Sequence, residues 1–190
     1  MPCGLRGLRG ISLDPFALPP MRLLALALVA LALPAAAQPG ARCLSPEADG
    51  LDFWIGTWDL TWETPDGAAR GTNTITRELG GCVVHERFEA ETGFDGESVS
   101  VLTPAGWRQT WVDNNGGYLL FEGATDATGR VAEMRTAPFE NPRGQTQISR
   151  MVWEDVTDDA FVWRWQASLD DGATWADRWV IRYTRADEAP

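Results

Sequence analysis

Beyond residue 52, short segments rich in Trp, Val, Thr and Phe alternate with turn signals at intervals of about 10–14 residues, which is typical of an all-β chain. The turns contain Asn-Gly, Asp-Gly and Gly-Gly pairs, which supply the positive φ that tight hairpins require. No stretch has the pattern of a long amphipathic helix, and 52–55 is expected to form one helical turn. Ten strands are predicted, at 58–64, 71–78, 83–91, 98–103, 108–113, 118–124, 130–136, 146–154, 160–168 and 175–184.

About ten sequential strands joined by short turns favour an up-and-down antiparallel barrel, because closure removes the exposed edges that an open sheet of this size would leave. A two-sheet sandwich is the alternative. The sequence has no repeat period typical of propeller blades or a solenoid, and no linker divides it. We therefore expect 38–190 to form a single β-barrel domain.

The segment MRLLALALVALALPAAAQ, which begins at Met21, has the layout of a secretory signal peptide. One arginine precedes an apolar run at 23–34, and three alanines follow, so cleavage is expected before Gln38. The run is shorter than the roughly 20 residues that a membrane span needs. Residues 1–37 are therefore predicted to be a leader, and the mature protein to be periplasmic or secreted.

Removal of the leader takes Cys3 with it and leaves Cys43 and Cys82. In an oxidising compartment an even pair of cysteines indicates a disulfide, which would join the mature N-terminus to the chain after Gly80-Gly81. A metal site is not expected, because His85 is the single histidine of the chain.

The net charge of −11 and the absence of lysine restrict the classes of partner that the protein is expected to bind. An acidic chain without a basic cluster argues against binding to nucleic acid and to anionic membrane surfaces. The sequence leaves the oligomeric state open.

Ten tryptophans in so small a chain require an explanation, and their spacing offers one. Alternate residues of a strand share one face, and most of the Trp-bearing faces are expected to point into the barrel. Either the indoles simply fill the barrel, or they line a pocket with a few placed polar groups. The faces are Trp58-Leu60-Trp62, Trp107-Gln109-Trp111-Asp113, Phe161-Trp163-Trp165 and Trp175-Asp177-Trp179-Ile181-Tyr183.

Two carboxylates are candidate site residues. Glu86 alternates with Val84 and Phe88 along its strand and is expected to point inward with them. Burial raises the pKa of a carboxyl group unless a charged partner is present, and Arg108 and Arg164 are the candidate partners. Asp113 precedes the turn 114–117, so it is either a turn cap or a second site residue.

The stretch SLDDGATW at 168–175 fits the Asp-box pattern of sialidases, Ser-x-Asp-x-Gly-x-Thr-Trp. Sialidases repeat the box along a longer chain and need a Tyr nucleophile beside a carboxylate, which neither Tyr118 nor Tyr183 provides. We expect a hairpin in which Ser168 and Asp170 accept backbone hydrogen bonds, Gly172 has positive φ, and Trp175 covers the turn.

Four ordered motifs, LDFWIGTWDLTW, ELGGCVVHERF, WRQTWVDNNGG and SLDDGATW, together resemble a family of exported bacterial domains of unknown function. The resemblance spans 52–185 and implies a barrel of the calycin group, which includes lipocalins and nitrobindins. Gly56-Thr57-Trp58 is similar to the lipocalin Gly-x-Trp, whose Trp packs under an Arg of the last strand, here Arg182 or Arg185. A nitrobindin-like haem site would need a histidine near the C-terminus, and no histidine follows His85, so no cofactor is expected.

The sequence thus predicts a barrel that binds a small apolar or aromatic molecule. An enzyme that uses Glu86 and Asp113 as acid or base, and a module that acts through its surface, are the alternatives. The predicted ligand-binding residues are Trp58, Glu86, Gln109, Trp111, Asp113, Trp163 and Trp165.

Overall fold

The computed structural model describes Cys43 and residues 45–187, so the predicted leader at 1–37 lies outside the described residues. This part of the chain forms eleven strands and two short 3-10 helices, η2 (Pro46–Trp54) and η3 (Leu79–Gly81). Within it, no helix has the length and apolar character needed to cross a membrane. The strands are β1 (Gly56–Thr64), β2 (Gly67–Glu78), β3 (Val83–Ala90), β4 (Asp95–Thr103), β5 (Gly106–Asp113), β6 (Tyr118–Thr125), β7 (Val131–Arg135), β8 (Phe139–Glu140), β9 (Thr146–Glu154), β10 (Ala160–Ser168) and β11 (Ala176–Arg185).

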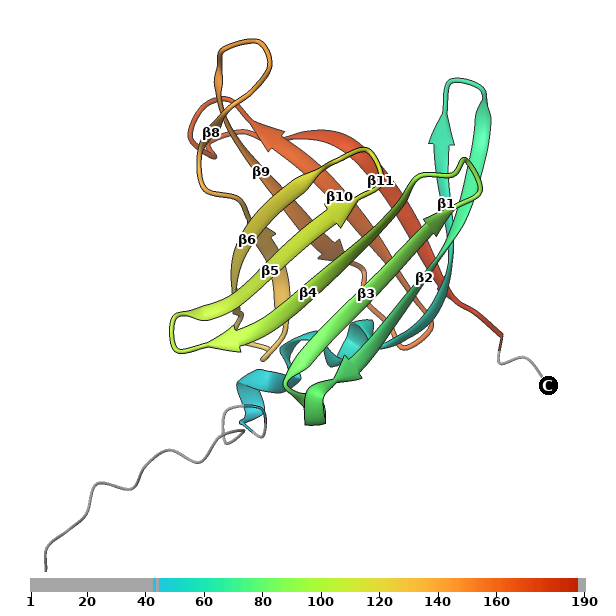
Figure 1. Cartoon of the computed structure of the whole chain (residues 1–190), viewed down its shortest axis with the longest axis vertical. Coiled ribbons are helices and arrows are strands. Elements are labelled where there is room, and N and C mark those ends of the chain that lie inside the picture. The colour runs from blue at the N-terminus through green and yellow to red at the C-terminus, as the bar shows by residue number, and fades with distance from the viewer. Residues whose placement is uncertain (1–42, 44, 188–190) are drawn as a thin grey trace, which may run out of the picture. The chain divides into compact units, whose positions relative to one another are not determined.

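Ten of these strands close into one antiparallel barrel (Figure 1). Strands β1 to β7 pair in chain order, β7 pairs with β9, and β9, β10 and β11 follow. The ring closes where β1 pairs with β11, with Leu60 opposite Tyr183. The predicted up-and-down barrel is therefore confirmed, and the two-sheet alternative is wrong because the sheet has no break at which it would divide.

Strand β8 is the element that the sequence did not predict. Its two residues pair with β9 alone and form a hairpin that projects from the connection between β7 and β9 (Figure 1). The side chain of Asn141 holds the turn, because its Oδ1 accepts hydrogen bonds from the amides of Arg143 and Gln145 at 2.9 and 3.1 Å. A strand of two residues is too short to leave a period in the sequence.

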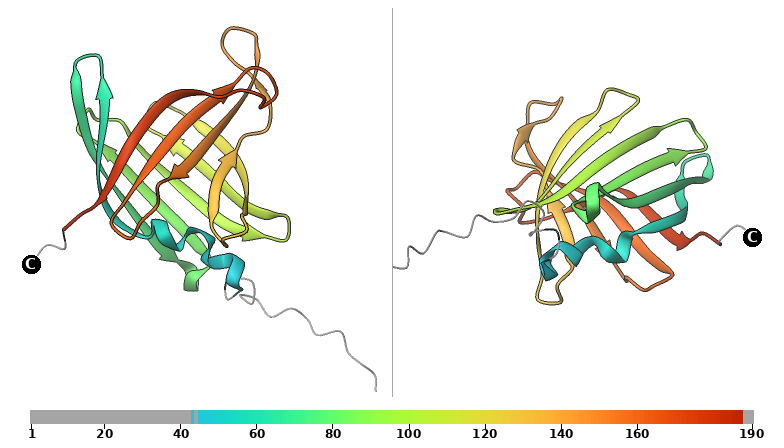
Figure 2. Two further views of the ribbon diagram at one scale, coloured as in Figure 1. Left: turned by 180° about the vertical axis from the view of Figure 1, so that it is seen from behind. Right: turned by 60° about the horizontal axis from the view of Figure 1, so that its bottom comes forward.

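The lower end of the barrel in Figure 1 is closed by η2, which is longer than the predicted turn at 52–55. Both views in Figure 2 also show this helix at one end of the barrel. Leu51 and Trp54 of η2 are fully buried, and the Trp54 ring lies edge-on to Trp153 with 5.4 Å between centroids. The helix thus forms an apolar floor beneath the barrel interior.

The Gly-x-Trp motif joins this floor to the last strand. The Arg185 guanidinium lies 4.1 Å from the Trp58 ring, and its Nη1 donates a hydrogen bond to the Ile55 carbonyl at 3.2 Å. Gly56 has a φ of 135°, a backbone conformation that other residues rarely adopt, which explains why glycine stands there. Of the two arginines predicted to cover Trp58, Arg185 is therefore the one that does so.

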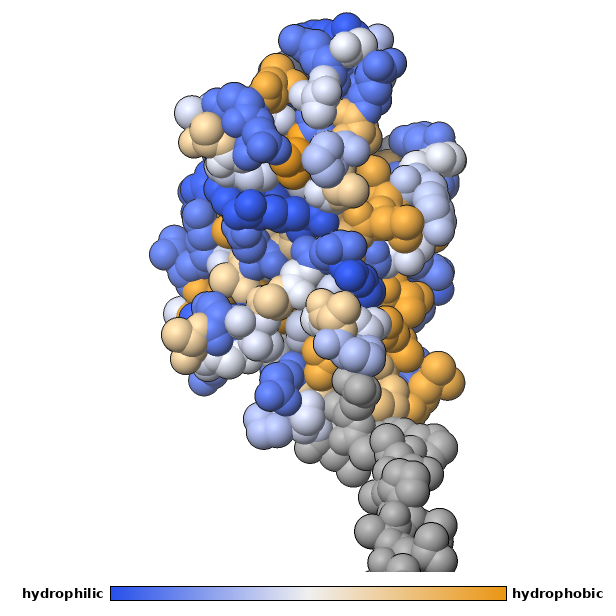
Figure 3. Space-filling model, turned by 90° about the vertical axis from the view of Figure 1, so that its left-hand side faces the viewer, coloured by the Kyte–Doolittle hydropathy of each residue, from blue (hydrophilic) through white to orange (hydrophobic). Residues whose placement is uncertain are grey.

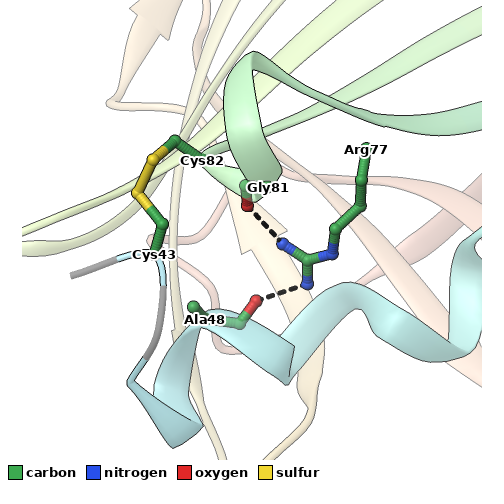
Figure 4. The surroundings of a disulfide bond; sticks show 5 residues. All are labelled: Cys43, Ala48, Arg77, Gly81 and Cys82. Atoms are coloured by element: carbon green, nitrogen blue, oxygen red, sulfur yellow. Dashed lines mark hydrogen bonds between the residues drawn. A yellow bond between two sulfur atoms is a disulfide. The ribbon is translucent and has the colours of Figure 1, made fainter. Parts of the chain in front are cut away.

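The disulfide between Cys43 and Cys82 is confirmed, with 4.7 Å between the two Cα atoms (Figure 4). It joins the segment before η2 to the connection between β2 and β3. Arg77 connects η2 itself to the same β2–β3 connection, because it donates hydrogen bonds to the Gly81 and Ala48 carbonyls at 2.9 and 2.6 Å. The floor is therefore attached to the barrel by a covalent bond and by an arginine.

One predicted face of the last strand is wrong in part. Trp165 lies opposite Trp179, but Gln166 lies opposite Asp177, so Arg178 is an extra residue in β11. This bulge reverses the alternation, and Asp177 points outward, where it accepts a hydrogen bond from Gln166 at 2.8 Å. Trp175 also lies on the outer face, with the Arg150 guanidinium 4.1 Å from its ring.

The Asp-box stretch forms the predicted hairpin. Ser168 Oγ accepts the Gly172 amide at 2.8 Å, and Asp170 Oδ1 accepts the Thr174 amide at 2.8 Å. Gly172 has a φ of 86°, and Trp175 lies beside it. Hydrogen bonds from the hydroxyl and amide of Thr174, and from the Ser168 hydroxyl, lower the pKa of Asp170 to about 2.

We expect Asp170→Ala to lower the melting temperature by a few degrees, because the turn loses the acceptor for three hydrogen bonds. Thermal unfolding followed by circular dichroism measures the change. Asp171→Asn is the control, since it removes a negative charge from the same turn at a position whose positive φ asparagine tolerates. Equal melting temperatures for the Asp170 variant and the unaltered protein would contradict this interpretation of the turn.

Candidate functional site

A cavity of about 220 Å³ lies inside the barrel above the floor. It extends from Trp54 of η2 to Phe94 and Asp113, which lie at the opposite end, where β3 joins β4 and β5 joins β6. The lining residues at that end are partly exposed, so the cavity opens there. Its wall consists of nine aromatic residues, three aliphatic residues and three polar residues.

Six of the seven predicted site residues line this cavity, and Trp58 does not. Trp58 lies near the start of β1, next to the floor; it is fully buried, and its indole donates a hydrogen bond to the Trp54 carbonyl at 2.8 Å. Both interpretations of the tryptophans therefore hold in part, since some fill the closed end and others line the cavity. The predicted residues that line it are Glu86, Gln109, Trp111, Asp113, Trp163 and Trp165.

The aromatic wall is held by contacts between its own rings. Trp163 lies edge-on to Trp179 at 6.0 Å, and Phe88 lies edge-on to Trp179 at 5.6 Å. A Cβ on Gly96 would overlap the Trp111 ring, so this glycine provides the space that the indole occupies. Because edge-on rings point their faces in different directions, a bound molecule could contact both ring faces and ring edges of the wall.

Glu86 is a buried carboxylic acid in the cavity wall, and its side chain accepts hydrogen bonds from neutral donors. The residue is 6% exposed. Its Oε1 accepts a hydrogen bond from Asn73 at 2.7 Å, and its Oε2 accepts one from Ser98 at 2.6 Å. Asn73 also donates to the Tyr183 hydroxyl at 3.0 Å.

The arginines predicted to pair with Glu86 lie elsewhere, on the outer face of the barrel. Arg108 forms an ion pair with Glu122, and Arg164 pairs with Glu154 and Asp177. The parity of the strands explains this correction, because residues next to inward positions such as Gln109 and Trp163 must point outward. Figure 3 shows that charged and polar side chains cover much of one outer face, with apolar side chains along its margin.

Burial raises the pKa of Glu86 from 4.5 to about 7, although the hydrogen bonds from Ser98 and Asn73 offset part of the effect. Burial and the neighbouring Glu86 carboxylate raise the pKa of Tyr183 well above its ordinary value, so the phenol stays neutral. Glu86 therefore gains or loses its charge close to neutral pH, while the Tyr183 phenol does not.

Asp113 combines the two roles that the sequence left open. Its Oδ1 accepts the amides of Gly117 and Asn115 at 2.9 and 3.0 Å, and its Oδ2 accepts the Trp111 indole at 3.0 Å. Partial burial alone would raise its pKa, but these hydrogen bonds outweigh it, and the pKa is lowered. Asp113 is thus a charged turn cap that also fixes a wall residue at the cavity mouth.

The sequence did not predict the three buried polar residues next to Glu86 and Gln109, which are Asn73, Ser98 and Ser100. Ser98 lies directly across from Glu86 in the ladder, and Ser100 lies across from Gln109, whose amide donates to it at 2.9 Å. The available signal was polar residues at inward positions of predicted strands. Without the register between strands, that signal assigns no partner.

Metal binding and histidine chemistry are two further possibilities for the described part of the chain. Within it, no group of three or more His, Cys, Asp or Glu residues is arranged to hold a metal ion. His85 points away from the interior and lies 3.6 Å from Glu97.

No family model matches this chain, and no curated protein matches it either. Among solved structures it is similar to a fluorescence-activating β-barrel designed de novo, at 14% identity and a TM-score of 0.38, covering 73% of this chain and 98% of that one. It is also similar to EF1p2_mFAP2b bound to DFHBI, at 12% identity and a TM-score of 0.35, covering 74% of this chain and 99% of that one. Scores this low transfer no ligand and no activity, and the family resemblance stays a prediction.

Proposed function

We propose that this protein is an exported barrel that binds a small, apolar or aromatic molecule in its cavity. The observation that carries the proposal is a cavity of about 220 Å³ with nine aromatic side chains in its wall and three polar ones. Ligand sites typically combine such walls with a few polar groups that orient the guest. The volume lies below the roughly 300–1,000 Å³ of drug-sized sites, so the ligand is expected to be small.

Export is part of this proposal. The segment 21–37 of the predicted leader has the layout of a signal peptide, and the disulfide between Cys43 and Cys82 is compatible with an oxidising compartment. A surface-acting module is less favoured, because such a module has no need of an open, aromatic-lined interior.

A second candidate function is an enzyme that uses the same cavity. Its support is the pKa of Glu86, about 7, because a general acid or base works best when its pKa lies near the working pH. Asp113 would then be the ionised partner at the mouth. Turnover that follows the titration of Glu86 and disappears in Glu86→Gln would favour this function over binding alone.

The proposal is tested by filling the cavity. We expect Leu119→Trp to weaken the binding of small aromatic molecules at least tenfold, since Leu119 lines the cavity and a larger ring would occupy it. Benzene-, indole- and naphthalene-type compounds are first screened by their effect on the tryptophan emission of the unaltered protein. Calorimetry then gives the affinity for each variant.

Leu120→Trp is the matched control, because this neighbouring side chain points outward and is 56% exposed. It should bind the compounds as the unaltered protein does. The proposal fails if no compound of the panel binds, or if both variants bind as well as the unaltered protein.

A further inference from the structure

The charges around the cavity have one sign. Two of its lining residues, Glu86 and Asp113, are carboxylic acids, and none is an arginine or a histidine. The arginines of neighbouring strands, such as Arg108 on β5 and Arg164 on β10, form ion pairs on the outer face. A guest in the cavity therefore meets negative charge and no positive side chain.

Glu86 is a buried acid without a cationic partner in the part of the chain that the structure describes. Its two hydrogen-bond donors, Asn73 and Ser98, are neutral. A buried carboxylate carries a desolvation cost that a nearby positive charge offsets. A cation that entered the cavity would supply the charge that the chain itself does not place there.

The aromatic wall suits the same guest. The faces of Trp rings attract cations, most strongly when water is excluded. Trp111 is fixed in place by its hydrogen bond to Asp113, and Trp163 and Trp179 lie nearly perpendicular at 87°. The net charge of −11 also draws cations toward the molecule as a whole.

We propose that the cavity selects small organic cations, namely an ammonium head on a compact apolar body, with Glu86 as the counter-ion and the tryptophans as the surrounding wall. This inference rests on the proposed binding function and names the ligand class. Organic carboxylates are excluded from the cavity, because Glu86 and Asp113 would repel them and no cationic side chain in the wall would compensate.

A dependence on pH follows from the groups around Glu86. Facing it are Asn73 on β2, Ser98 on β4 and Tyr183 on β11, of which only the tyrosine titrates, and Tyr183 stays neutral. His85 points outward beside Glu97, and its positive charge, when present, lowers the pKa of Glu86. Asp113 at the mouth stays ionised near neutral pH. Affinity for a permanent cation should therefore rise as the Glu86 proton is lost, through about pH 7.

The test compares phenyltrimethylammonium with tert-butylbenzene, which has the same shape without the charge. In the unaltered protein, calorimetry should show at least tenfold tighter binding of the cation at about pH 8.5 than at about pH 5.5. In Glu86→Gln this pH dependence should vanish, and the ratio of cation affinity to neutral affinity at high pH should fall at least tenfold. Glu97→Gln removes the same charge from the outer face of β4 and should retain both the ratio and the pH dependence.

The inference is overturned if tert-butylbenzene binds but the cation does not, or if Glu86→Gln leaves the ratio unchanged. Either result would leave the proposed binding function standing, with a neutral ligand. If neither probe binds and the aromatic panel also fails, the proposed function itself is wrong. The pH profile of the unaltered protein needs no variant, so the inference is testable even if Glu86→Gln alters the fold.

Discussion

Replacement of Glu86 by glutamine is expected to stabilise the protein by about 3 kcal/mol above pH 7, and by little below about pH 4. The unfolded chain ionises this carboxyl near its ordinary pKa of 4.5, whereas the folded protein retains the proton up to about pH 7. As pH rises between these values, the unfolded state loses the proton first, and the unaltered protein loses stability. Glutamine has the same shape and no proton to lose.

Urea unfolding of the two proteins at about pH 4, 6 and 8 measures this difference. Glu97→Gln, at a half-exposed position on the outer face, controls for the loss of one negative charge and should show no such growth with pH. A free-energy difference that stays constant across the three pH values would show that Glu86 does not titrate in this range.

Loss of the disulfide is expected to cost about 4 kcal/mol of unfolding free energy on the chain-entropy model, for a sequence separation of 39. The double variant Cys43→Ser, Cys82→Ser releases the start of η2, and Trp54 of this helix lines the bottom of the cavity. Urea unfolding should therefore show a lower midpoint, and binding of the aromatic panel should also weaken.

The control for this change is the unaltered protein in reductant, which should approach the stability of the double variant. Alkylation without reductant of protein purified from the periplasm should find no free thiol at Cys43 or Cys82. Two free thiols, or a double variant as stable as the disulfide-bonded protein, would contradict the assignment.

The sequence predicted the barrel well because the signals for it are local. Each strand has its own composition, and each hairpin its own turn residues, so ten strands were found near their observed positions. The inward direction of Glu86 was also predictable, since it alternates with Val84 and Phe88, which are both buried. Only β8, with two residues, was too short to detect.

What escaped prediction depends on relations between strands. The partners of Glu86 come from β2 and β4, and only the register brings Asn73 and Ser98 to it. Trp58 has the inward parity of a lining residue, but parity does not say how far along the barrel axis a side chain lies. The bulge at Arg178 changes the face of Asp177, and nothing in the local sequence signals that extra residue.

The seam between β1 and β11 has a consequence for the order of folding. Every other neighbouring pair in the ring is joined by a short connection or by the β8 hairpin, whereas the seam joins residues as distant in sequence as Trp58 and Arg185. Hairpins form from nearby residues at small entropic cost, but the seam must bring the two ends of the chain together. We therefore expect ring closure to come late in folding. The contact between Arg185 and Trp58 would then form at that step and hold the two end strands together.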